Sequence, residues 1–161
     1  MDVNWLSEDE LTAWKRLVAV VELLPGVLDS QLRKDAELTN YEYYVLAMLS
    51  ESPDRTLRMT ALAQRTNATL PRLSHVVRRL EDRGLVERFP CPQDKRATNA
   101  RLTPEGMEAV MAAAPGHVGA VRRLVFDALD ARQVAQLREL GDALLSTLDA
   151  DGQMTSLYAG S

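Results

Sequence analysis

Residues 69–106 read TLPRLSHVVRRLEDRGLVERFPCPQDKRATNARLTPEG, and the order of signals in this stretch decides the fold. Its first part predicts a helix over 70–83. Thr69 is a good N-cap, Pro71 falls in the first turn, where proline is tolerated, and Gly84 is a C-terminal glycine stop. The helix is therefore marked at both ends.

A strand hairpin is predicted directly after this helix. Residues 85–89 predict a strand, 90–97 a loop and 98–102 a returning strand. Thr103 and Pro104 then open another helix, with threonine as its cap and proline at its first position. We interpret the hairpin as a wing.

The segment before Thr69 completes a helix-turn-helix. Residues 60–66 predict a short helix, and Asn67 with Ala68 forms the turn. Two short helices joined by a turn of three to four residues describe this motif. Its second helix enters the major groove of DNA, with its N-terminal half nearest the bases. We therefore expect 70–83 to be a recognition helix.

The basic residues of the chain are concentrated in the same region. The whole chain carries a formal net charge of −4. Residues 65–101 hold nine Lys and Arg against four Asp and Glu, which gives +5 here and −9 elsewhere. This pattern is typical of a nucleic-acid footprint confined to one surface. From charge alone, a solvated helix face is the alternative.

The predicted recognition helix has two opposite faces. On a wheel of about 100° per residue, one face is apolar and must pack on the body of the domain: Leu73, Val76, Val77 and Leu80. The other is polar and basic, and arginine and serine can read base edges. From this side we expect DNA contacts by Thr69, Pro71, Arg72, Ser74, His75, Arg78 and Arg79.

The predicted wing carries Asp94, Lys95 and Arg96 at its tip, and we expect all three at the DNA. A wing can reach the adjacent minor groove, where arginine is attracted by negative potential. Asp94 is close enough in sequence to orient the Arg96 guanidinium by a paired hydrogen bond. The alternative is a solvated turn with a local Asp–Arg contact.

Long amphipathic helices are predicted on both sides of this unit. Residues 8–35 carry an apolar stripe, with Ser7 and Glu10 as a capping box and a kink at Pro25. A last helix is predicted over 130–148. The first stripe is longer than a small core needs, which indicates sharing with a second chain.

The combination resembles the MarR family of winged-helix transcription regulators. The resemblance rests on DKRATNARLTPEG, residues 94–106, preceded by LSHVVRRLEDRGLVERFPCPQ, and on the helix order. The family pattern is an Asp-x-Arg in the wing, a strand, and Leu-Thr-x-x-Gly at the next helix. Those positions are Asp94, Arg96, Leu102, Thr103 and Gly106.

The resemblance implies a mainly α fold with a small β-wing: a winged helix-turn-helix flanked by N- and C-terminal dimerisation helices. We expect dimerisation segments at 1–38 and 104–148, a DNA-binding domain at 39–103 and a flexible tail at 149–161. The implied function is a homodimeric repressor of a pseudo-palindromic operator, relieved by a small, often phenolic, ligand. The partners would be double-stranded DNA and a second copy of the chain.

A ligand pocket is suggested by aromatic and methionine side chains in the first two helices. The candidates are Trp14, Tyr41, Tyr44 and Met48. Such a stripe at helical spacing also describes core packing. His117 is expected to be a bystander, and Cys91, at the wing base, is either an unremarkable residue or a redox-sensitive thiol.

Other function classes lack support in the sequence. There is no paired-carboxylate, Ser-His-Asp, phosphate-loop or metal-binding pattern, so we expect no enzyme, cofactor or metal. No apolar run approaches the roughly 20 residues of a membrane span, and the acidic start does not resemble a signal peptide. With one cysteine, a cytoplasmic protein is expected. A winged-helix protein–protein module without operator binding remains the alternative function.

Overall fold

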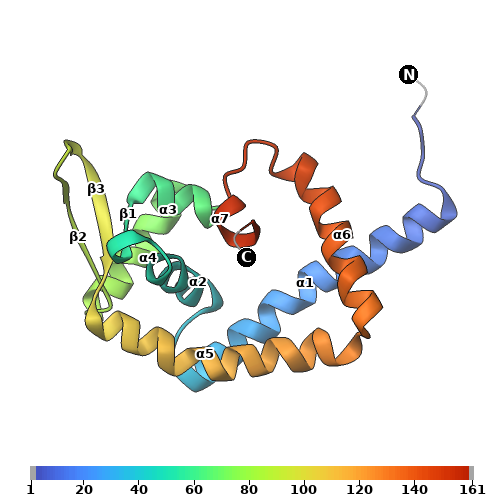
Figure 1. Cartoon of the computed structure of the whole chain (residues 1–161), viewed down its shortest axis with the longest axis horizontal. Coiled ribbons are helices and arrows are strands. Elements are labelled where there is room, and N and C mark those ends of the chain that lie inside the picture. The colour runs from blue at the N-terminus through green and yellow to red at the C-terminus, as the bar shows by residue number, and fades with distance from the viewer. Residues whose placement is uncertain (1–2, 160–161) are drawn as a thin grey trace.

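The computed structural model describes residues 3–159, which form a mainly helical molecule with one small sheet (Figure 1). The predicted fold class is confirmed. The elements in chain order are α1 (Glu8–Ala36), α2 (Asn40–Ser50), η1 (Pro53–Arg55), β1 (Thr56–Arg58), α3 (Met59–Arg65), α4 (Leu70–Asp82), β2 (Val86–Cys91), β3 (Asp94–Leu102), α5 (Pro104–Leu124), η2 (Phe126–Ala128), α6 (Ala131–Leu148) and α7 (Thr155–Tyr158).

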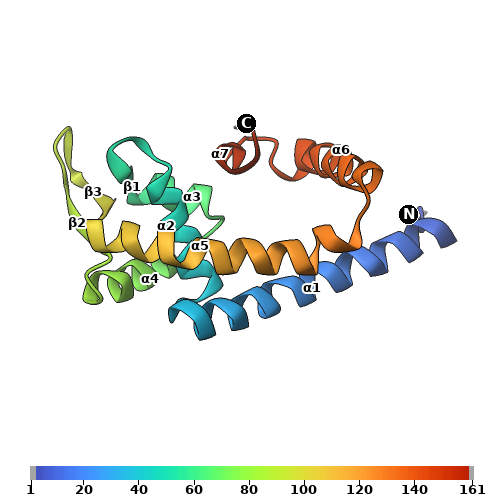
Figure 2. The ribbon, with the colours of Figure 1, turned by 60° about the horizontal axis from the view of Figure 1, so that its bottom comes forward.

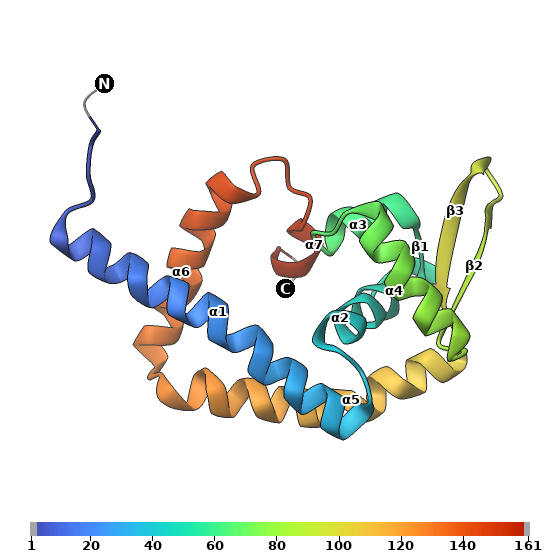
Figure 3. The ribbon, with the colours of Figure 1, turned by 180° about the vertical axis from the view of Figure 1, so that it is seen from behind.

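The core lies within the winged helix-turn-helix, between α2, α3, α4 and the sheet. The apolar face predicted for the recognition helix is buried there, with Leu73, Val77 and Leu80 fully covered. Burying a leucine or valine side chain stabilises the fold by about 1.5–3 kcal/mol. Figure 3 shows α3 and α4 beside the wing, held from behind by α2. The outward face of α4 is thus presented on a fixed support.

The sheet has three antiparallel strands in the order β1-β3-β2. The predicted loop over 90–97 is wrong, because β2 continues to Cys91 and β3 begins at Asp94. Pro90 pairs with Thr98 near a register shift in the ladder. Proline lacks an N–H but is tolerated on an edge strand, and β2 is an edge strand. The wing is therefore two long strands with a tight turn.

The helices α1 and α5 run side by side and support the winged unit from below (Figure 2). The predicted capping box is present: the amide of Glu10 donates to Ser7 Oγ at 3.2 Å, and the Ser7 amide donates to Glu10 Oε2 at 2.7 Å. Pro25 lies inside a continuous α1. α5 ends at Leu124, because the backbone leaves the helical region at the next residue.

The last helix and the tail complete the described chain. The predicted last helix is present as α6, which Asp130 caps, yet none of the residues of α6 is buried. The segment predicted to be a flexible tail contains a turn and α7, and it returns toward α3 (Figure 1). Positions 160 and 161 of that predicted tail lie outside the described residues. Within 3–159, no helix combines the length and apolar character of a membrane span.

Candidate nucleic-acid interface

The outward face of α4 presents most of the predicted contact residues to solvent. Pro71, Arg72, His75, Arg78 and Arg79 are exposed. Within the described residues, Arg78 forms no ion pair with an acidic side chain. Its guanidinium is therefore free to meet a ligand.

Residues toward the two ends of this face make contacts within the protein. The Thr69 hydroxyl accepts a hydrogen bond from the Arg72 amide at 3.4 Å, and so caps the helix as predicted. The Arg72 guanidinium lies over the ring of Tyr41, with Cζ 4.4 Å from the ring centroid. Such a cation–π contact contributes about 0.5–1 kcal/mol at an exposed site and restricts the arginine.

Arg79 is engaged inside the protein. Its Nη2 lies 3.0 Å from Oε1 of Glu42, whose side chain is only 2% exposed. The other carboxylate oxygen of Glu42 accepts the Thr39 amide at 2.8 Å, which closes the capping box of α2. Arg79 is predicted to contact DNA, but in this structure its guanidinium pairs with Glu42 in the first turn of α2.

A second ion pair joins the wing to α4. The guanidinium of Arg88 donates to Glu81 Oε2 from Nε at 3.1 Å and from Nη2 at 2.9 Å, and its amide donates to Oε1 at 3.0 Å. These contacts, together with the positive charge of Arg88, lower the pKa of Glu81 below its ordinary value. Nη1 of Arg88 also donates to Ser74 Oγ at 3.4 Å.

This clamp was not among the predicted site residues. Glu81 and Arg88 belong to a helix and a strand, so their pairing depends on how the chain turns at Gly84, whose φ is +73°. This turn directs β2, the first strand of the wing, back toward α4. Ser74, predicted to read a base edge, is half-buried and oriented by Arg88.

The wing tip carries an almost fully exposed arginine. The Arg96 side chain is 95% exposed. Asp94 Oδ1 accepts the Arg96 amide at 3.1 Å and is 3.5 Å from its Nε. Asp94 therefore fixes the backbone of the turn and makes one long hydrogen bond to the guanidinium, in place of the predicted pair. Lys95 is exposed beside it.

Comparison with known proteins identifies the family to which this fold belongs. Residues 38–98 match the MarR family. The structure is similar to that of Sco3205, a MarR family transcriptional regulator from Streptomyces coelicolor solved in complex with DNA, with 43% identity, a TM-score of 0.86, and coverage of 90% of this chain and 91% of that one. The chain belongs to the MarR family.

Two further relatives support this placement. AbsC, a MarR family transcriptional regulator from Streptomyces coelicolor, is 34% identical, with a TM-score of 0.86 and coverage of 92% of this chain and 99% of that one. The HTH-type transcriptional repressor YetL of Bacillus subtilis is 28% identical over 65% of this chain and 63% of its own length. The matches span 55–63% of the curated relatives. These relatives are regulators, in agreement with the expectation that this MarR family chain is not an enzyme.

The cysteine of this MarR family member is buried at the wing base. Cys91 Sγ accepts a hydrogen bond from Arg58 Nη2 at 3.4 Å and donates to Gln93 Oε1 at 3.2 Å. A backbone hydrogen bond from Gln93, followed by the Arg58 contact, lowers the pKa of the thiol. Among the described residues, no group of three or more His, Cys, Asp or Glu side chains could hold a metal ion.

The structure has a cavity near the predicted ligand pocket, but only two of the four predicted residues line it. A cavity of about 420 Å³ is lined by Leu28, Asn40, Tyr43, Tyr44, Ala47, Met48, Glu51, His117 and Leu157. Tyr44 and Met48 were predicted there. Tyr41 and Trp14 do not line it: the Tyr41 hydroxyl bonds Thr66 Oγ1 at 2.9 Å, and Trp14 is half-exposed on α1. His117, expected to be a bystander, forms part of the wall.

Proposed function

We propose that this chain is a homodimeric DNA-binding repressor that binds a pseudo-palindromic operator and is released by a small ligand. The main support is the outward face of α4. There Arg78, which has no ion-pair partner among the described residues, lies between His75 and Arg79 on a helix fixed by its buried side. The Streptomyces coelicolor relative in complex with DNA supports this reading.

The contacts divide between two grooves. In this proposal α4 lies in the major groove, where Arg78 can bridge O6 and N7 of a guanine and His75 stands one turn nearer the N-terminus. Arg96 and Lys95 at the wing tip enter the neighbouring minor groove. Arg79 has a double role, because its half-exposed side chain can reach a phosphate while it pairs with Glu42.

Dimerisation is supported by apolar surface that the described chain leaves uncovered. The helix α6 has an apolar stripe, and Leu140 and Leu148 are 63% and 80% exposed. An apolar cavity of about 450 Å³, lined by α1, α5, η2 and α6, opens beside this stripe. Uncovered apolar surface of this kind marks an interaction site. We assign it to a second copy, because the two half-sites of a pseudo-palindrome require two α4 helices.

Ligand release is supported by the cavity between α2 and α5, since these helices connect the winged unit with the dimerisation helices. A ligand can change operator binding only if it binds one spacing of the two α4 helices more tightly than the other. The mechanism is then a shift of population between two dimer conformations.

The deciding experiment is selection of genomic fragments by the purified protein, followed by titration of a selected fragment at several salt concentrations. The expected result is a pseudo-palindromic site with half-sites roughly 10 base pairs apart and an affinity that falls steeply with salt. Enrichment of no sequence, together with weak salt dependence, would favour the protein–protein module instead.

The dimer is tested by one charged residue in the apolar stripe. Leu140→Glu should yield monomers in sedimentation and lower operator affinity, whereas Ser146→Glu, on the opposite side of α6, should leave the dimer intact. A Leu140→Glu protein that sediments like the parent would overturn the assignment of α6 to the dimer interface.

A further inference from the structure

Tyr41, in the first turn of α2, contacts the outward-facing helix α4. Cζ of Arg72 lies over its ring, 4.4 Å from the ring centroid. Arg72 is exposed to solvent and, within residues 3–159, forms no ion pair with an acidic side chain. The Tyr41 ring therefore restrains this arginine where no carboxylate does.

The ring of Tyr41 is itself held by a hydrogen bond to the end of α3. Its hydroxyl lies 2.9 Å from Oγ1 of Thr66, a residue that is only 4% exposed. Oγ1 of Thr66 donates to the carbonyl of Leu62 at 2.7 Å. Because a threonine hydroxyl has one proton, Tyr41 must be the donor to Thr66. The aromatic face that meets Arg72 is thus fixed in orientation.

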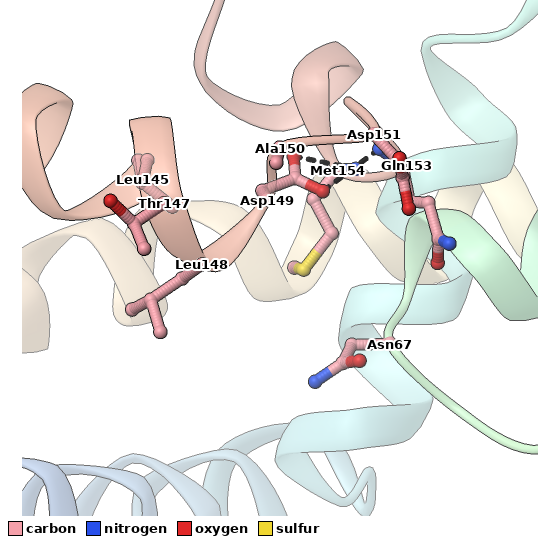
Figure 4. A pocket seen from close by; sticks show the side chains of 9 residues that line it. All are labelled: Asn67, Leu145, Thr147, Leu148, Asp149, Ala150, Asp151, Gln153 and Met154. Carbon is pink, nitrogen blue, oxygen red and sulfur yellow. Dashed lines mark hydrogen bonds between the residues drawn. The ribbon is translucent and has the colours of Figure 1, made fainter.

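The turn between α3 and α4 is held from the same side. The Tyr44 hydroxyl donates to the carbonyl of Arg65 at 2.9 Å. Asn67, in the turn, lies across a cavity from the C-terminal turn (Figure 4). Within the described chain, the side-chain hydrogen bonds that reach 65–67 from another element come from α2. The first turns of α2 therefore fix the start of α4 relative to Tyr41.

Arg72 lies on a flank of α4 and not at the centre of its outward face. With about 100° per residue, Arg72 lies roughly 120° round the helix from Arg78, and Arg79 lies about 100° from it on the same side. Glu42, next to Tyr41, pairs with Arg79 on this flank. When Arg78 points to the base edges, the flank points to the wall of the groove, which is the phosphate backbone.

A guanidinium over an aromatic ring keeps its hydrogen-bond donors. Its N–H groups lie in the guanidinium plane, and their fork matches the oxygens of a phosphate. The ring therefore restrains Arg72 without occupying these donors. Immobilising a flexible side chain on binding costs free energy, and a side chain that is already restrained in the free protein costs less. The geometry favours a preorganised phosphate contact.

We propose that Tyr41 is a positioning residue for operator binding: its ring holds the Arg72 guanidinium, and the edge of that guanidinium bonds a DNA phosphate beside the major groove. This inference rests on the proposed operator binding and adds to it a residue of α2 that acts through Arg72. A phosphate contact is independent of base sequence, so it raises affinity without changing the preference for any base.

The role of the ring is tested by titrating the selected operator with Tyr41→Leu and, as the matched control, Tyr41→Phe. Tyr41→Leu should weaken binding about fivefold, because Arg72 must then be ordered on binding. Tyr41→Phe keeps an aromatic face under the arginine and should stay within about twofold of the parent. Equal losses in the two variants, or tighter binding by Tyr41→Leu, would contradict the proposal.

A double-mutant cycle shows whether Tyr41 acts through Arg72. Arg72→Ala should weaken binding about tenfold and reduce the slope of log affinity against log salt by about one, on operator and on random DNA alike. Adding Tyr41→Leu to Arg72→Ala should change affinity by less than about twofold. A further fivefold loss would show that Tyr41 acts through another group. An unchanged salt slope, or an altered base preference, in Arg72→Ala would refute the phosphate contact.

The parent protein separates this inference from the proposed function. Selective, salt-dependent operator binding by the parent, together with undiminished binding by Tyr41→Leu, would refute the role of Tyr41 alone. A parent protein that selects no DNA would refute both.

Discussion

The guanidinium of Arg79 lies 3.0 Å from the carboxylate of Glu42, a side chain that is almost completely buried. The pair joins the outward-facing helix α4 to the first turn of α2. Glu42 Oε1 accepts no hydrogen bond within the described residues, so it depends on the charge of Arg79. Arg79, on the candidate DNA face, thus also compensates the negative charge of the buried Glu42 carboxylate.

Loss of this arginine should therefore reduce stability as well as DNA affinity. Arg79→Ala leaves a buried charge uncompensated, and the free energy of unfolding should fall by about 1–2 kcal/mol, a reduced value because Arg79 is half-exposed. Urea denaturation measures it. Adding Glu42→Gln should recover part of the loss. Unchanged stability in Arg79→Ala would leave DNA contact as its only role.

Among the described residues Arg78 has no such acidic partner, so the effect of its loss should be confined to DNA binding. Arg78→Ala should cost about 1–3 kcal/mol of operator affinity and relax the preference at one base pair, if its guanidinium bridges a guanine. The thermal midpoint should not change. An equal loss on random DNA would instead identify a phosphate contact.

The role of the wing arginine is tested by a matched pair of arginine-to-alanine substitutions. Arg96→Ala should weaken operator binding by about tenfold while the dimer stays intact, because an exposed tip residue supports no packing. Arg122→Ala, in the last turn of α5 at the end away from the wing, should have little effect (Figure 1). Unchanged affinity of Arg96→Ala at moderate salt would remove the wing from the mechanism.

The Glu81–Arg88 clamp should make stability depend on pH. The folded-state pKa of Glu81 lies below its ordinary value of 4.5, so the clamp contributes fully above pH 4.5 and is lost as pH falls through the lowered pKa. Glu81→Gln should lower the free energy of unfolding by about 1–2 kcal/mol near pH 7. That difference should shrink in acid.

Asp82→Asn is the control for the clamp, because Asp82 is exposed and forms no ion pair within the described residues. It should leave stability nearly unchanged. A difference between wild type and Glu81→Gln that stays constant from pH 7 to pH 3 would show that the pair does not carry the effect.

Gly106 is required by a close approach of α5 to the start of the wing. A Cβ here would collide with the carbonyl oxygen of Leu85 and lie 2.6 Å from Leu102 Cδ1. Gly106→Ala should destabilise the fold by about 1–3 kcal/mol in chemical denaturation. Gly26→Ala, where the added carbon meets nothing within 4 Å, should be neutral or stabilising. Equal effects would contradict the steric explanation.

Local signals were enough to predict the elements of the winged unit. The caps Thr69 and Thr103, the stop at Gly84 and the apolar face of α4 all act within a few residues, and each is found as predicted. The prediction of a loop over 90–97 is wrong, because proline normally interrupts strands but Pro90 lies within β2. Pro90 is accepted because β2 has a free edge, a fact of sheet order rather than of local sequence.

The sequence by itself determined the helix order, the outward basic face of α4 and the family resemblance, because these depend on periodicity, caps and short motifs. Only the tertiary structure decided which of the basic residues are free. Arg79 is held by Glu42 and Arg88 by Glu81, whereas Arg78 has no acidic partner within the described chain. It also placed His117 and Leu157 in one cavity. These relationships join distant segments, and side-chain contacts across a fold follow from packing, which no local pattern encodes.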